Sequence, residues 1–131
     1  MNTNNKTAGN EPWQDDPFAA AYPETAEFWS AAAQGDLMLS TCDDCSKAHW
    51  YPRMVCPMCG SAKVKWVKAS GRGKLYAFSP ARRADPTYTL AYVTLDEGPT
   101  LMTNIIDAAP EDLTIGQAVQ VRFQAADEGR M

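Results

Sequence analysis

The residues of this chain best suited to chemistry are its four cysteines, which form two Cys-x-x-Cys pairs. Two residues between cysteines let one tight turn aim both sulfurs at a single point. Ten residues separate the pairs, which is enough for a hairpin that brings the two turns together. Four sulfurs in a tetrahedral array suit Zn²⁺, with bonds of about 2.3 Å. We therefore predict one structural zinc ion, with the ligands Cys42, Cys45, Cys56 and Cys59.

Other uses of these cysteines are weaker hypotheses. A rubredoxin-like iron site has the same four-sulfur geometry, so the spacing leaves zinc and iron open. A thiol-exchange role has no thioredoxin-like βαβ context here. Four thiolates fill the coordination shell of zinc and leave no position for water, which indicates a structural ion. His49, the only histidine, lies between the pairs, and we expect it on the hairpin or its surface and outside the ligand set.

Helices are predicted before the cysteines. Apolar residues recur four positions apart, as with Phe18 and Tyr22, and this spacing places each pair on one helical face. Pro23 separates a first turn from a second helix of about 11 residues. Gly35 is the expected end of that helix. Residues 1–14, rich in Asn and Thr, are predicted to be a disordered tail.

After the cysteines the pattern changes to that of β-strands. Val119, Val121 and Phe123 alternate with polar residues, which predicts a half-buried strand. Runs rich in β-branched and aromatic residues, separated by Gly- and Pro-containing turns, predict further strands. About five short strands within about 60 residues favour a small barrel. The other four runs are residues 64–68, 74–79, 88–95 and 101–106.

Composition and charge limit the class of protein. The chain has 131 residues, 45% of them hydrophobic, which fits one compact domain or two small modules. The formal net charge is −4, and a Zn²⁺ ion held by four thiolates would take it to about −6. This balance argues against a general nucleic-acid binder. No apolar run is long enough to span a bilayer and residues 1–10 do not form a secretory signal, so we expect a cytoplasmic protein.

Short motifs spread along the chain carry a family resemblance. Besides the paired cysteines they are Glu27-Phe28-Trp29, Gly35-Asp36-Leu37, Pro52-Arg53, Cys56-Pro57-Met58-Cys59-Gly60-Ser61, Ser70-Gly71-Arg72-Gly73-Lys74-Leu75-Tyr76, Tyr92-Val93-Thr94-Leu95-Asp96-Glu97-Gly98-Pro99 and Ile115-Gly116-Gln117-Ala118-Val119. In this order they resemble the zinc-ribbon OB-fold proteins of the DUF35 family. Ser46 departs from the pattern, because many members have Gly after the second cysteine; this changes one turn but removes no ligand.

The resemblance implies a mainly β fold with an N-terminal helical segment, a rubredoxin-like zinc ribbon and a C-terminal five-stranded OB-fold barrel. It also implies a non-catalytic subunit of a heteromeric complex. Such subunits dock on thiolase-like or other acyl-CoA enzymes and support the binding or transfer of CoA thioesters while carbon–carbon bonds are cleaved or formed. The expected division is a tail at 1–14, helices at 15–36, the ribbon at 37–67, the OB fold at 68–126 and a tail at 127–131.

Two further sets of residues are candidate sites in such a complex. CoA carries several phosphates, which Arg and Lys side chains bind well. Aromatic residues are enriched at the centres of protein interfaces, and packing on the chain's own barrel is the alternative for them. The expected CoA contacts are Arg72, Lys74, Arg82 and Arg83. The expected partner interface is Phe18, Tyr22, Phe28 and Trp29.

Two other functions compete with this one. OB folds and zinc ribbons also bind nucleic acids, although the acidic balance counts against that role here. An independent enzyme has candidate acids and bases but no recognisable pair of base and nucleophile. The candidate stacking platforms are Tyr76, Phe78, Tyr88 and Tyr92, and the candidate acids and bases are Asp85, Asp96, Glu97 and Asp107.

Overall fold

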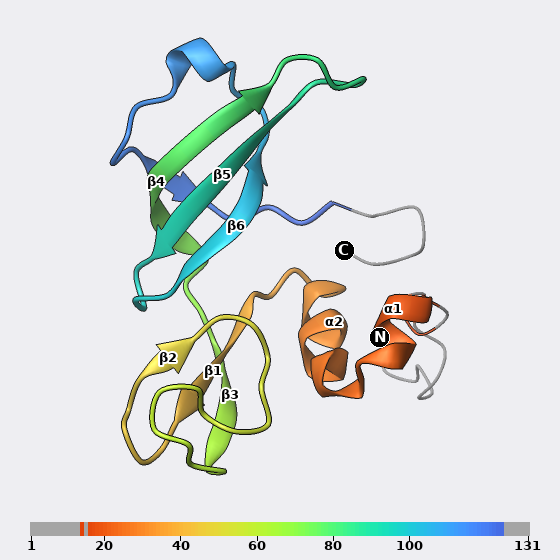
Figure 1. Ribbon diagram of the computed structural model, residues 1–131, viewed down its shortest axis with the longest axis vertical. Coiled ribbons are helices and arrows are strands. Elements are labelled where there is room, and N and C mark those ends of the chain that lie inside the picture. The colour runs from red at the N-terminus through yellow and green to blue at the C-terminus, as the bar shows by residue number, and fades with distance from the viewer. Residues whose placement is uncertain (1–13, 15, 125–131) are drawn as a thin grey trace.

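The chain folds into a short helical segment, a three-stranded ribbon sheet and a curled four-stranded sheet, as Figure 1 shows. This is a computed structural model, and it describes residue 14 and residues 16–124, without the side chain of Phe18. The fold is mainly β, as predicted. The predicted tails lie outside the described residues, apart from residue 14. The domain boundaries given above stay predictions.

The helical segment consists of α1 (Pro17–Ala21), the 3-10 turn η3 (Pro23–Thr25) and α2 (Ala26–Ala32). The second helix is shorter than predicted because the turn that Pro23 opens is 3-10 and not α-helical. Gly35 ends the segment with a φ of +87°, a conformation that glycine adopts without steric cost. Among the described residues, no helix is long and apolar enough to cross a membrane.

The ribbon sheet holds β1 (Met38–Cys42), β2 (Ala48–His49) and β3 (Val64–Lys68) in the antiparallel order β2-β1-β3. The strand at 64–68 has the predicted bounds, but it belongs to the ribbon and not to the barrel. Its five residues all pair with β1, from Met38 opposite Lys68 to Cys42 opposite Val64. The ribbon therefore begins and ends on neighbouring strands, which brings the two cysteine pairs together.

The curled sheet holds β4 (Arg72–Ala81), β5 (Tyr88–Leu95), β6 (Thr100–Ile105) and β7 (Ala118–Gln120) in the order β6-β5-β4-β7. A 3-10 turn, η4 (Pro110–Asp112), lies between the last two strands. This sheet has four strands where the sequence predicted five, because β3 pairs in the ribbon. The alternation at 119–123 yields a strand of only three residues, since pairing with β4 covers Arg72 to Lys74 alone.

One hydrophobic core joins the three parts. Leu37 and Leu39 from the ribbon side pack in the same cluster as Leu75, Val93 and other buried residues of the curled sheet. Partly buried residues from α2 and the ribbon, among them Phe28, Trp50 and Val67, pack against this cluster. The ribbon and the curled sheet therefore share buried surface, so the metal module is held in a fixed place relative to the OB-type sheet.

A substitution at Gly73 in β4 tests the close packing of β4 against β5. A Cβ atom there would lie 2.6 Å from the Thr94 carbonyl oxygen and 2.8 Å from a methyl group of Val93, so the strands would have to move apart. We expect Gly73→Ala to lower the free energy of unfolding by about 2 kcal/mol, measured by denaturant titration. Ser79→Ala, on an exposed position of the same strand, should change it by less than about 0.5 kcal/mol. Equal effects of the two variants would contradict this account.

Candidate metal centre

The four cysteines meet at one end of the ribbon. Their sulfur atoms all lie within 4.8 Å of one another. The Sγ atoms of Cys42 and Cys59 are 3.6 Å apart, and those of Cys45 and Cys56 are 3.7 Å apart. A disulfide would need about 2.0 Å, whereas a tetrahedron with bonds of about 2.3 Å needs edges of about 3.8 Å. The separations therefore fit four ligands around one zinc ion and not two disulfides.

Each cysteine pair sits in the same kind of tight turn. In the first turn the Ser46 amide donates to the Cys42 carbonyl at 2.9 Å, and in the second the Gly60 amide donates to the Cys56 carbonyl at 2.9 Å. Both donors have left-handed backbones, with φ of 62° at Ser46 and 80° at Gly60. Ser46 thus adopts the conformation that glycine would adopt more easily, which explains why its departure from the family pattern leaves the turn intact.

Backbone amides inside the turns point at the sulfurs. The Asp44 amide donates to Cys42 Sγ at 3.3 Å, and the Met58 amide donates to Cys56 Sγ at 3.3 Å. The pKa of the Cys42 thiol falls from 9.0 to about 7, first because of the hydrogen bond from the Cys45 backbone amide. A lowered pKa favours the thiolate, which is the form that binds metal.

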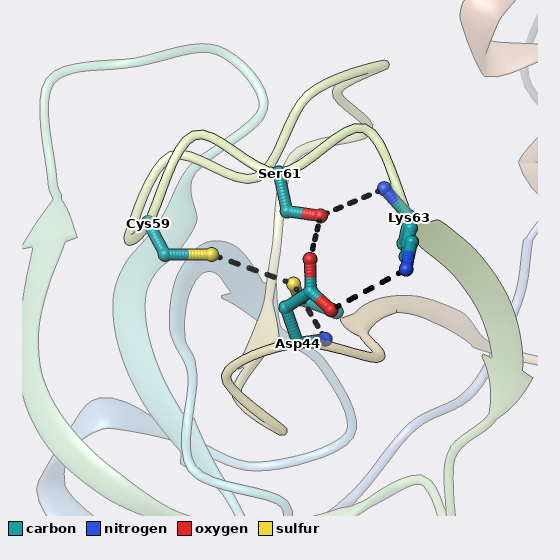
Figure 2. A network of polar contacts seen from close by, with 5 residues as sticks. Asp44, Cys59, Ser61 and Lys63 are labelled. Atoms are coloured by element: carbon teal, nitrogen blue, oxygen red, sulfur yellow. Dashed lines mark hydrogen bonds and ion pairs between the residues drawn. The ribbon is translucent and has the colours of Figure 1, made fainter.

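A polar clamp, formed by Asp44, Ser61 and Lys63, joins the two turns (Figure 2). Ser61 Oγ donates to Asp44 Oδ2 at 2.6 Å and accepts from the Lys63 amide at 3.0 Å. Lys63 Nζ also lies 3.9 Å from Asp44 Oδ1, although both side chains are largely exposed. The sequence prediction missed this clamp; the acidic residues inside the first cysteine pair were the available signal.

His49 is buried rather than on the surface. It lies in β2 with only 5% of its surface exposed, and it is outside the cysteine cluster. Neither ring nitrogen has a hydrogen-bond partner among the described residues. Burial, together with the charge of Arg53, lowers the pKa of His49 below 6.5. The expected hairpin position is confirmed and the expected surface position is wrong, because the side chain projects to the same face as buried Ser40.

The four predicted CoA-contact residues do not converge. Arg72 and Lys74 lie at the start of β4, whereas Arg82 and Arg83 follow its end, about 30 Å away along the strand. Arg82 Nη1 lies 3.6 Å from a carboxylate oxygen of Glu111. An apolar groove of about 470 Å³ lies elsewhere, between α2, the ribbon and the curled sheet, and none of the four lines it. Its lining includes Phe28, Trp50, Leu101, Val119 and Phe123.

The predicted partner-interface residues are also in different environments. Phe28 packs against the chain's own core, with its ring centroid 5.0 Å from that of Trp29 and 5.3 Å from that of Trp50. Trp29 is half-buried, and its indole N–H donates to Thr25 Oγ1 at 3.0 Å. Tyr22 is exposed, and the side chain of Phe18 lies outside what the structure describes. The geometry therefore favours own-core packing for Phe28.

The ribbon, its sulfur cluster and the curled sheet define a zinc-ribbon OB-fold protein. Residues 29–65 match the rubredoxin-like zinc ribbon domain of ChsH2, and residues 66–124 match the C-terminal OB-fold domain of ChsH2. The chain is 30% identical, over 115 residues, to a DUF35 domain-containing scaffold protein of Methanothermobacter thermautotrophicus, covering 80% of this chain and 85% of the relative. The chain therefore belongs to the DUF35 family, and its four close cysteines are consistent with one structural zinc.

Two further relatives connect this family to larger proteins and complexes. A chain of the Ltp2-ChsH2(DUF35) aldolase is 32% identical, with a TM-score of 0.69, and the match covers 79% of this chain and 87% of that one. A probable enoyl-CoA hydratase alpha subunit of Thermomonospora curvata is 32% identical over 116 residues, or 85% of this chain. The chain spans only 36% of the length of that relative.

Exchanging the residue types at Ser46 and Gly60 tests the role of the left-handed backbone in the two cysteine turns. Ser46→Gly should raise the free energy of unfolding of the zinc-loaded protein by about 0.5–1 kcal/mol, because it relieves a left-handed backbone at a side-chain-bearing residue. Gly60→Ser should lower it by about 1 kcal/mol for the opposite reason. Denaturant titration at equal zinc content measures both. A loss of stability in Ser46→Gly would show that the serine side chain, and not its backbone, supports the turn.

Proposed function

We propose that this chain is a non-catalytic zinc-binding subunit that docks on a thiolase-like enzyme and supports the binding or transfer of acyl-CoA. The reaction served would be cleavage or formation of a carbon–carbon bond, carried out in the partner's active site. The observation that carries the proposal is the match to a chain of the Ltp2-ChsH2(DUF35) aldolase over 87% of that chain's length. A match over nearly the whole fold supports a similar role for this chain.

In this proposal Cys42, Cys45, Cys56 and Cys59 bind one zinc ion that orders the ribbon. Four sulfur ligands leave no open position for water, so the ion would stabilise structure and would not activate a nucleophile. His49, the one histidine, is only 5% exposed, so it offers a substrate little access. The chain's contribution would therefore be a shaped and rigid surface.

The acyl-CoA part of the proposal has two supports. One relative is a probable enoyl-CoA hydratase alpha subunit, which acts on a CoA thioester by its name. The apolar groove of about 470 Å³ has the size and lining typical of small-molecule sites, and it would suit an acyl chain. Exposed Arg83, beyond the end of β4, remains a candidate contact for CoA phosphates.

Complex formation tests the proposal. When this chain is co-expressed with a thiolase-like enzyme of the same organism, we expect the two to co-elute from a sizing column at micromolar concentration. A thiolase from a genomic setting without a DUF35 gene serves as the control and should elute separately. Separate elution of the chain and the thiolase-like enzyme of its own organism would overturn the proposed function.

A further inference from the structure

The outer face of the curled sheet carries a stripe of large exposed side chains. Tyr92 in β5 lies directly opposite Met102 in β6, and directly opposite Ala77 in β4. Because residues opposite each other project to the same face, Ala77, Tyr92 and Met102 form one row across the sheet. The register shifts between Leu75 and Ala77, so Tyr76 is an extra residue beside the same row. The stripe consists of Tyr76, Tyr92 and Met102.

These side chains face away from the core. The exposed fractions are 66% for Tyr76, 46% for Tyr92 and 56% for Met102, whereas their strand neighbours Leu75 and Val93 are almost fully buried. A β-bulge that projects an aromatic residue outward is a built feature and not a defect of the strand. Tyr and Met are also enriched at the centres of protein interfaces. The stripe has the composition of an interface centre.

The charges around the stripe indicate what it binds. None of the four strands of this sheet contains Asp or Glu, and their only charged side chains are Arg72 and Lys74. Lys74 lies opposite Thr94, in the row next to the stripe, and Thr94 shares a hydrogen bond of 2.8 Å with Thr100. Neither Arg72 nor Lys74 forms an ion pair in the described part of the chain. Asp96 and Glu97 lie in the turn that follows β5, next to Arg72, whose carbonyl accepts from the Asp96 amide at 2.9 Å. The strands of this face are therefore apolar at their centre and carry two cations on one side, beside an acidic turn.

We propose that this outer face is the surface on which the chain docks to its protein partner, whose contact region would present apolar side chains to the stripe and carboxylates to Lys74 and Arg72. The proposal rests on the function proposed above and names the docking face. It gives these two cations a protein partner in place of the CoA predicted from sequence. Figure 1 shows the three strands concerned side by side.

Two other occupants fit less well. A second copy of the chain would bring two more cations and no carboxylate from its own four strands to this face, since its Asp96 and Glu97 lie in the turn beyond β5 and not on the sheet. Single-stranded nucleic acid binds through rows of cations along its phosphates as well as stacking platforms, and this face has only two cations. Met102, at one end of the stripe, offers no ring on which a base could stack. A protein surface remains the best match.

The test is the affinity of the zinc-loaded chain for the purified thiolase-like enzyme, measured by calorimetry. Replacing both Tyr92 and Met102 with Thr, a good strand former, should weaken binding by about 30-fold, as loss of a central contact does. Lys74→Glu should weaken it by about 10-fold. Met54→Thr is the matched control, since Met54 is 74% exposed in the ribbon loop, and it should change affinity less than about 2-fold. Equal zinc content and circular dichroism confirm folding.

The outcomes separate this inference from the proposed function. If the wild-type chain binds the enzyme and the stripe variants bind equally well, the docking face is wrong while the function stands. If Met54→Thr alone weakens binding, the ribbon loop is the docking surface instead. If the wild-type chain and the enzyme do not bind each other, the proposed function is wrong, and the proposed docking face is then wrong as well. The proposal would also be overturned if the chain bound an oligonucleotide, or associated with itself, and the double variant at Tyr92 and Met102 lost that binding.

Discussion

The structure depends on the convergence of four sulfur atoms from two tight turns. The ribbon is a small segment with three short strands, and one of them has only two residues. Such a segment buries too little apolar surface to fold by itself, and a metal ion held by four thiolates supplies the missing free energy. The polar clamp through Asp44 and Ser61 joins the same two turns, but its groups are exposed, so its contribution is small by comparison.

The metal module matters to the rest of the chain because the two sheets share a core. Leu39 of the ribbon and Leu75 of the curled sheet belong to one buried cluster, and Phe28 of α2 packs against it. Ordering the ribbon therefore also orders one side of the curled sheet. A rigid, two-part surface of this kind suits a scaffold, because docking then costs little conformational entropy.

Features set by local spacing were predictable from the sequence, and features set by distant contacts were not. The two Cys-x-x-Cys turns and the strand at 88–95 follow from local patterns, and the structure has both. The strand at 64–68 also has the predicted bounds, but its sheet depends on pairing with β1, which no local pattern encodes. The burial of His49 and the bulge at Tyr76 are likewise products of cross-strand register. The CoA-contact prediction grouped cations near in sequence, and the length of β4 separates them.

The most direct test of the central claim is elemental analysis of the natively purified chain, combined with hydrogen exchange before and after chelation. The account predicts about one equivalent of zinc per chain and a loss of amide protection across β1 and β3 when the metal is removed. Well under one equivalent of zinc plus iron, in a protein whose ribbon strands are still protected, would contradict it.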